Sequence, residues 1–442
     1  MTQLALLGGA PVRDKAFPAY NVITEEEKSA VMDVMNTGVL SKYLGVWHED
    51  FLGGPQVRAF EEEWADVFNA KHAVAVNSAT SGLYAAMGAA GVQPGDEVIV
   101  PSLSMSASAT AAVVWGGVPV FCDIDPETFS PSPESVLANI TPQTKAIMLV
   151  HLLGHPVDMK PIMAAARERG IIVIEDCAQA IHATYDERPV GTLADIGVFS
   201  LNYHKHIHTG EGGVCLTNDA GLAERMQLIR NHAEAVAAGL QPDNLVNLVG
   251  FNFRMGEIEA AIGRSLLKKS KRLLEERREN VAYLEARIGA LPGLPFAKVK
   301  SNCTHAYYAH AFHNQEEVHG VSRDLMVKAL RAELPITKMR DEARGPLLGP
   351  GYLAPLYRLP MFQKKIAFGD AGFPFIGPHI KREISYPEGL CPKAEQATQS
   401  MVTHEMMRPG MSHNDLNDVA AAFHKVFDNL DHLRAVQAHK EV

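Results

Sequence analysis

The chain has 442 residues, of which 47% are hydrophobic and 21% charged, which is the balance of an ordinary folded protein and excludes a mainly disordered one. This length is too great for one small core and favours two domains packed together. The formal net charge of −10 at pH 7 excludes a global basic field for nucleic acid, so no nucleic-acid partner is expected.

Cysteine spacing and apolar content predict where the protein resides. The 5 cysteines include no C-x-x-C pair, which is typical of reduced thiols in a cytosolic protein. The opening MTQLALLGGAPVRDK lacks the basic region and the long apolar region of a signal peptide. The longest weakly polar stretch, residues 98–121, is interrupted by Pro101 and by Gly116-Gly117, so it is not a membrane span. We therefore expect a cytoplasmic protein without a membrane partner.

From about residue 57 to residue 217, helical patterns alternate with short runs of β-branched residues. Strands separated by helical crossovers predict a mainly parallel sheet with helices on both faces, which is an α/β fold. Helices are expected at 60–68, 81–91 and 164–170. Strands are expected at 72–77, 98–102, 118–124, 146–153, 171–176, 196–201 and 214–218.

The pattern changes after Gly263. The run at 266–288 predicts one long, charged helix with a solvated face, which links to a smaller C-terminal domain. We therefore predict a large domain over residues 1–265 and a small α+β domain over residues 266–442. Residues 334–392 are rich in Pro and Gly and are expected to be irregular.

A helix is also predicted near the C-terminal end of the sequence. Ser412 and Asp415 have the spacing of a capping box at its start. An apolar stripe follows, which we expect to be core rather than a partner site, and it consists of Val419, Phe423, Val426 and Leu430.

The segment that carries most of the chemistry is VIEDCAQAIHATYDERPVGTLADIGVFSLNYHKHIHTGEGG, residues 173–213. Asp176 follows one predicted strand, and Ser200 and Lys205 follow the end of another. Ligands of open α/β sheets bind at the carboxyl ends of strands. An acid and a lysine at neighbouring strand ends suit pyridoxal 5'-phosphate, because a lysine holds its aldehyde and an acid pairs with its ring nitrogen.

Upstream, NSATSGLYAAM (77–87) places hydroxyl residues where a strand meets a helix. Backbone N–H groups at this helix start, together with the hydroxyls of Thr80 and Ser81, would bind a phosphate. An ordinary Ser/Thr helix cap explains this pattern equally well when it is taken alone.

Seven segments in order resemble the sugar aminotransferases of the DegT/StrS type, which have the aspartate-aminotransferase-like fold of pyridoxal-phosphate enzymes. The resemblance runs from about residue 5 to residue 310. The segments are NSATSGL, PGDEVIVPS, PVFCDIDPETF, ITPQTKAI, VIEDCAQA, GVFSLNYHKHIHTGEGG and GFNFRMGEIEAAIG.

The resemblance implies roles for individual residues near the cofactor. Lys205 matches the family's Schiff-base lysine, Asp176 the partner of the ring nitrogen, and Gln179 a side chain that flanks the ring. Phosphate contacts are implied for Thr80, Ser81 and Ser200.

Further from the cofactor, the resemblance implies a homodimer with shared active sites. Asn252 and Arg254 match residues that the family presents across a dimer interface into the neighbour's site, and His305 matches a histidine near the substrate. Met105 departs from the family, which usually has an aromatic residue stacked on the ring at this position. A methionine can lie flat against a ring, so cofactor binding is still expected.

Other interpretations of these residues are weaker. Lys205 taken alone would be a surface lysine, since lysine is mostly exposed. His204, His206 and His208 alternate as metal ligands could, but no carboxylate or cysteine completes a ligand set, and no metal is expected. The GEGG run at 210–213 precedes a strand, so it is not a dinucleotide fingerprint.

The resemblance implies an aminotransferase that works in two half-reactions, with Lys205 as general base and then acid. The expected donor is glutamate or glutamine, and the expected acceptor is the keto group of a nucleotide-linked deoxy-sugar. A keto-cyclitol acceptor is the alternative. A non-catalytic regulator that binds pyridoxal phosphate or another ligand also remains compatible with the fold. The related sugar dehydratases carry a histidine in place of Lys205.

Overall fold

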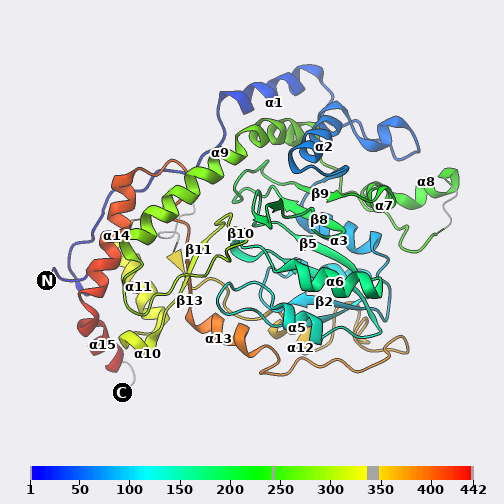
Figure 1. The fold of residues 1–442 in the computed structure, drawn as a ribbon. Helices are drawn as coiled ribbons and strands as arrows, with labels where there is room; N and C mark the ends of the chain where they lie inside the picture. The colour runs from blue at the N-terminus through cyan, green and yellow to red at the C-terminus, as the bar shows by residue number, and fades with distance from the viewer. Residues whose placement is uncertain (1, 241–243, 336–347, 440–442) are drawn as a thin grey trace.

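The computed structural model describes residues 2–240, 244–335 and 348–439 (Figure 1). Its centre is a 7-stranded sheet in the order β1-β9-β8-β5-β4-β2-β3. Neighbours from β8 to β3 are parallel, and β9 lies antiparallel between β8 and β1. The mainly parallel α/β sheet is therefore confirmed. The strands are β1 (His72–Val76), β2 (Glu97–Pro101), β3 (Val118–Cys122), β4 (Thr144–Val150), β5 (Ile172–Asp176), β8 (Ile196–Ser200) and β9 (Gly213–Thr217).

Successive side chains of these strands point to opposite faces, and each face packs into its own apolar core. Val98 and Val100 of β2 join the first core, whereas Ile99 joins the second. The first core is covered by α3 (Ala79–Ala89), α4 (Ala107–Val114) and α7 (Ala220–Arg230). The second is covered by α2 (Pro55–Phe68), α5 (Pro133–Ala138), α6 (Met159–Arg169) and the first half of α9 (Glu257–Ile288).

The long helix α9 begins nine residues earlier than the sequence suggests, since it starts at Glu257 and runs through Gly263. A Cβ atom added at Gly263 would lie 2.8 Å from the Phe60 ring of α2. The glycine therefore allows the two helices to approach closely rather than ending the helix.

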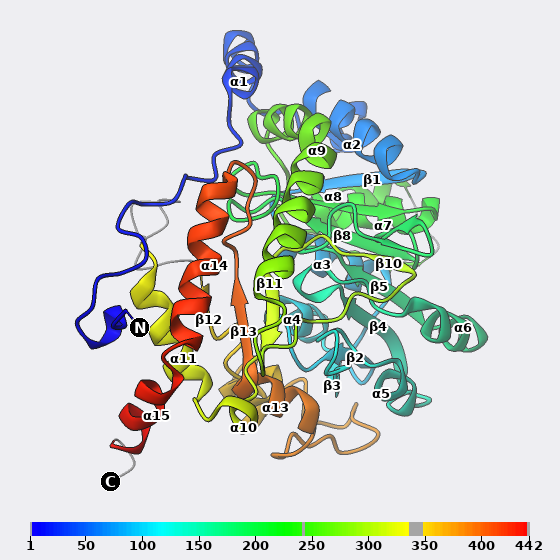
Figure 2. The same ribbon diagram turned by 60° about the vertical axis from the view of Figure 1, so that its left-hand side comes forward.

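A second layer lies beside the other half of α9 (Figure 2). Its antiparallel sheet has the order β11-β13-β12, and its apolar core includes Phe312, Phe423 and Val426. The expected capping box of Ser412 and Asp415 is present at the start of α14, and its apolar stripe faces this core. The elements are β11 (His310–His313), α10 (Glu316–His319), α11 (Arg323–Glu333), β12 (Leu348–Gly349), β13 (Met401–His404), α14 (His413–Phe427) and α15 (Leu430–Ala438).

Packing across the two layers does not follow the chain in a simple way. Leu4 and Phe17 join the core of the second layer, whereas the segment from Leu356 to Ala397 joins the first core of the central sheet. In that segment, the rings of Phe362 and Tyr386 lie 5.1 Å and 5.5 Å from Phe121 of β3. The segment thus covers the sheet edge at β3. The domain division at residue 265 stays a prediction.

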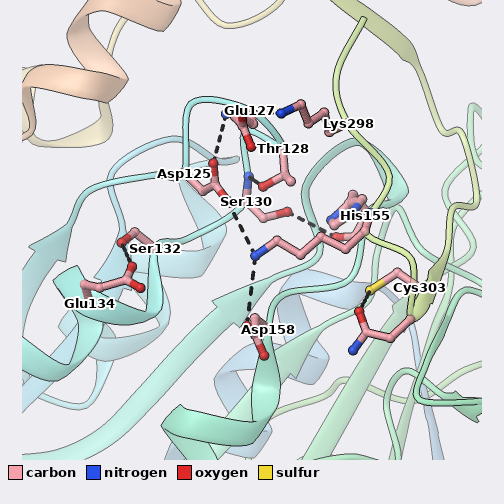
Figure 3. A network of polar contacts seen from close by, with 12 residues as sticks. Asp125, Glu127, Thr128, Ser130, Ser132, Glu134, His155, Asp158, Lys298 and Cys303 are labelled. Atoms are coloured by element: carbon pink, nitrogen blue, oxygen red, sulfur yellow. Dashed lines mark hydrogen bonds and ion pairs between the residues drawn. The ribbon is translucent and has the colours of Figure 1, made fainter.

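Polar contacts join the loop after β3 to the chain that follows α9 (Figure 3). Lys300 Nζ lies 3.5 Å from Asp125 and 4.0 Å from Asp158, and Lys298 pairs with Glu127. His155 Nε2 accepts the Lys300 N–H at 3.2 Å. These contacts fix the loop after β4, which forms part of the site described below.

None of the described helices has both the length and the apolar character needed to cross a membrane. The remaining elements are, apart from α1, short or peripheral. They are η1 (Ala5–Leu7), α1 (Glu25–Thr37), η2 (Glu49–Leu52), η3 (Leu152–Gly154), β6 (Thr184–Tyr185), β7 (Arg188–Pro189), α8 (Ala233–Leu240), β10 (Cys303–Thr304), η4 (Leu356–Arg358), α12 (Pro360–Gln363) and α13 (Pro392–Ser400).

Candidate active site

A cavity of about 420 Å³ lies at the carboxyl ends of the parallel strands. Its walls come from the loops after these strands and from the β12–β13 part of the second layer. Six of the ten residues that the sequence singled out line it: Thr80, Met105, Asp176, Gln179, Ser200 and Lys205.

Asp176 is the last residue of β5 and lies buried at the base of the cavity. Its Oδ2 accepts a hydrogen bond from Ser108 Oγ at 3.0 Å, and its Oδ1 accepts the Ala178 N–H at 3.1 Å. Burial raises the pKa of Asp176, while these hydrogen bonds and Lys205 act in the opposite direction. A cationic ligand group beside Asp176 would favour its charged form, so the site suits a protonated ring nitrogen.

Lys205 lies in the loop after β8, where its backbone N–H donates to Asn202 O at 2.8 Å. Its Nζ lies 4.4 Å from the centroid of the Tyr308 ring. Burial lowers the pKa of Lys205 to about 8, although the charge of Asp176 opposes this. An amine with this pKa is partly neutral near pH 7 and can attack a carbonyl carbon.

Gln179 is held by its hydrogen bonds in one orientation. Its Oε1 accepts the Leu153 N–H at 2.6 Å, and its Nε2 donates to Tyr352 Oη at 3.0 Å. The loop that carries Leu153 is itself fixed, because Gly154 O accepts the Ala306 N–H at 2.9 Å. The side chain of Gln179 is therefore a rigid part of the cavity wall.

The start of α3 forms the opposite end of the cavity, where Ser78, Ala79 and Thr80 line the wall. Ser78 caps the helix, because its side chain accepts the Ser81 N–H. Ser81 lies outside the lining: its Oγ donates to Asn77 Oδ1 at 2.7 Å and lies 2.9 Å from Ser78 Oγ. Of the two hydroxyls expected here, Thr80 is thus the one at the cavity.

Asn252 and Arg254 do not line the cavity of their own chain. Asn252 is exposed, and its Oδ1 accepts a hydrogen bond from Arg254 Nε at 2.8 Å. Their assignment to a neighbour's site stays a prediction.

His305 is not brought to the cavity either. It is buried and stacked on Tyr307, with 4.1 Å between the ring centroids, and its Nδ1 accepts the Tyr307 N–H at 2.7 Å. In the same THAYYAH run, it is Tyr308 that lines the cavity.

Several residues that line the cavity or support its side chains were not predicted from the sequence. Ser108 and Tyr308 each lie three residues after a residue that the sequence singled out, Met105 and His305, so these neighbours could have drawn attention to them. Tyr352, Thr403 and Glu405 lie outside every recognised motif, although all three line the cavity.

The alternating histidines do not converge. His206 is buried with its ring bonded to Ala306 O at 2.8 Å, whereas His204 lines the cavity. Within the described residues, the cluster that has metal-ligand spacing is His151, Glu175 and Cys177. The Glu175 carboxylate already accepts the N–H groups of Gly191, Leu193 and Ala194, which makes it a structural anchor.

This donor set fits pyridoxal phosphate. Asp176 would pair with its ring nitrogen, Lys205 would hold its aldehyde, and Gln179 would lie against the ring. Thr80 and the N-terminus of α3, with Ser200, would bind its phosphate, because free N–H groups at a helix start favour an anion.

Comparison with known proteins also identifies similarity to aminotransferases. Residues 22–367 match the DegT/DnrJ/EryC1/StrS aminotransferase family. The chain is 37% identical over 336 residues to the GDP-perosamine synthase of Caulobacter vibrioides, covering 75% of this chain and 84% of that protein. It is 33% identical over 444 residues to the L-glutamine:2-deoxy-scyllo-inosose aminotransferase of Streptomyces fradiae, covering 96% and 98%.

Solved structures share the whole fold. An aminotransferase from Psychrobacter cryohalolentis superposes with a TM-score of 0.78 at 30% identity, covering 94% of this chain and 100% of that chain. DesI in the presence of its TDP-sugar product superposes with a TM-score of 0.79 at 26% identity, covering 99% of each chain.

Proposed function

The chain belongs to the DegT/DnrJ/EryC1/StrS aminotransferase family, and from that membership we propose that it transfers an amino group from an amino acid to the keto group of a nucleotide-linked deoxy-sugar. The observation that carries the proposal is the cavity in which buried Asp176 and Lys205 lie with the N-terminus of α3. Relatives named for sugar nucleotides support this acceptor class.

The residues of the chain divide the work as follows. Pyridoxal phosphate, when bound, supplies an electron-accepting ring and an aldehyde that carries the amino group between substrates. Asp176 stabilises positive charge on the ring nitrogen. Lys205 Nζ, whose pKa is lowered to about 8 by burial, accepts a proton from the donor carbon and returns it as an acid.

A keto-cyclitol acceptor is the second candidate, and a specific observation favours it. The match to an inosose aminotransferase covers 96% of this chain, whereas the match to the GDP-perosamine synthase covers 75%. The name of the inosose enzyme also makes L-glutamine the donor to test beside L-glutamate.

We also propose that the active unit is a homodimer. Exposed apolar side chains lie on two segments near Asn252 and Arg254: Val46 and Trp47 on one, and Leu245 and Val249 on the other. The two segments adjoin, because Asn231 Nδ2 donates to Leu44 O at 2.8 Å and Asn231 Oδ1 accepts from Arg254. Large exposed apolar side chains on adjoining segments are typical of a protein interface. We propose the cytoplasm as the location of the protein, since the 5 cysteines are free and buried.

Near-visible absorption tests the proposal. Adding pyridoxal phosphate should produce an absorption band, and L-glutamate or L-glutamine should then bleach it. A keto-sugar or keto-cyclitol should restore the band, and the one that does so faster identifies the acceptor class. A band that ignores every amino donor would favour the regulator instead.

Lys205→Ala should reduce turnover by about a thousand-fold or more while leaving the fold intact, because the proton transfer loses its base. Turnover and far-ultraviolet circular dichroism check this, with the exposed Lys298→Ala as the matched control. Near-normal turnover in Lys205→Ala would contradict the role of Lys205.

A further inference from the structure

Resting on the proposed function, we propose that Tyr352 is a specificity-determining residue whose hydroxyl donates a hydrogen bond to a hydroxyl or carbonyl oxygen of the keto acceptor. Tyr352 lines the cavity and comes from the segment that follows β12, outside every motif of the sequence. The inference depends on the direction of one hydrogen-bond chain.

The hydrogen-bond chain begins at a backbone N–H group, and this fixes the direction of the bonds that follow. The Leu153 N–H can only donate, so the atom of Gln179 that faces it at 2.6 Å is the carbonyl Oε1. The amide nitrogen Nε2 of Gln179 must then point to Tyr352 Oη, 3.0 Å away, and donate to it. The orientation of the Gln179 amide thus follows from the backbone.

Tyr352 therefore accepts from Gln179 and keeps its own proton for another partner. A phenol has one O–H to donate in addition to its acceptor capacity. Across the described residues, the one hydrogen bond of Tyr352 Oη is the bond from Gln179. The cavity, which Tyr352 lines, is where a ligand oxygen can take this proton.

The hydroxyl remains a donor over the working pH range. Burial raises the pKa of Tyr352 to about 12, the hydrogen bond from Gln179 acts against this, and the charge of Asp176 adds to it. A neutral phenol donates, whereas a phenolate could only accept.

The surrounding wall has the chemistry of a polyhydroxylated ligand. β12 pairs with β13, opposite Thr403 and His404, and Thr403 and Glu405 also line the cavity. The second layer thus supplies two hydroxyls and a carboxylate, while the cofactor groups come from the central sheet. A site built to hydrogen-bond a ligand hydroxyl rejects analogues that lack it, because its polar groups lose their partner.

Tyr352→Phe tests the inference, because it keeps the ring and removes only the hydroxyl. We expect kcat/KM for the acceptor half-reaction to fall about 10- to 100-fold. The donor half-reaction and the affinity for pyridoxal phosphate, measured by fluorescence titration, should change by less than about threefold. An equal loss in both half-reactions and in cofactor affinity would mean that Tyr352 only supports Gln179, and would overturn the inference.

Tyr386→Phe is the matched control. It removes a buried hydroxyl from the same segment, and this hydroxyl donates to Pro119 O at 2.8 Å, outside the cavity lining. Its acceptor kinetics should equal those of the unaltered protein.

Acceptor analogues that lack one ring hydroxyl at a time give a second test, made on both the unaltered protein and Tyr352→Phe. One position should cost the unaltered protein about 10- to 100-fold in kcat/KM, and Tyr352→Phe should no longer distinguish that analogue from its parent. The inference would be overturned if, at every ring position, removal of the hydroxyl lowered kcat/KM equally in the unaltered protein and in Tyr352→Phe. If none of the amino donors bleaches the absorption band of the unaltered protein, the proposed function itself fails. If the enzyme is active but Tyr352→Phe leaves its acceptor kinetics unchanged, this inference alone fails.

Discussion

At the residue scale, burial controls the chemistry of Lys205. Removing an ammonium group from water disfavours its charged form, and this is the main cause of the lowered pKa. Asp176 partly offsets the effect, so the amine stays titratable rather than permanently neutral.

The pH dependence of cofactor capture follows from this shift. Only the neutral amine attacks an aldehyde, so capture of pyridoxal phosphate by the protein should accelerate as pH rises and level off above about 8. At pH 7 roughly 10% of Lys205 would be neutral, against roughly 0.03% for a lysine with an ordinary pKa. Stopped-flow absorbance checks this, and a midpoint near 10 would contradict it.

Sequence motifs predicted several residues that line the cavity, because these residues follow strands in short, ordered phrases. Asp176, Gln179 and Lys205 reach one cavity for that reason. Motifs could not decide which side chain in a tight turn faces inward: Tyr307 has φ 48°, which turns His305 into the protein and Tyr308 into the cavity. Tyr352 lies in the segment at 334–392, for which the sequence predicted irregular structure but no individual site residue, because strand pairing with β13 is what brings it to the cavity.

At the scale of elements, the boundary of α9 illustrates the same limit. The predicted helix began at residue 266, after the change of pattern at Gly263, and a glycine inside a helix reduces its intrinsic stability. Contact with Phe60 overrides this preference, since no larger residue would fit. The central strands could be predicted without such knowledge from their continuous apolar runs, because a parallel sheet covered by helices needs apolar residues on both faces.

Gly263→Ala should therefore lower stability instead of raising it. Alanine would gain about 1 kcal/mol of helix propensity, but overpacking against Phe60 should cost about 1–3 kcal/mol. Thermal unfolding should show a lower midpoint than in the unaltered protein. The double variant Gly263→Ala, Phe60→Leu should recover part of the loss, and a stabilised Gly263→Ala would contradict the packing explanation.

At the scale of the whole molecule, the proposed homodimer would cover the exposed side chains of Val46 and Trp47. Sedimentation should give twice the chain mass of 48.1 kDa. Val46→Asp should weaken the dimer and lower activity upon dilution, because a charge in an apolar interface loses its hydration. Val318→Asp is the control, since Val318 is similarly exposed on α10, in a different part of the fold. A monomer with full activity would contradict the shared site.

The clasp between the two ends of the sequence has a consequence for synthesis. Arg13 pairs with Asp415 at 2.7 Å, and the Ala5 N–H donates to the Glu333 carboxylate at 2.7 Å. On a ribosome that adds about 5–20 residues each second, the N-terminal segment that carries Arg13 waits roughly 20–80 s for Asp415. The core around Leu4 and Phe17 stays incomplete during that time, because it includes Leu416, Val419 and Phe423, so chaperones that bind nascent apolar segments have a defined interval in which to act.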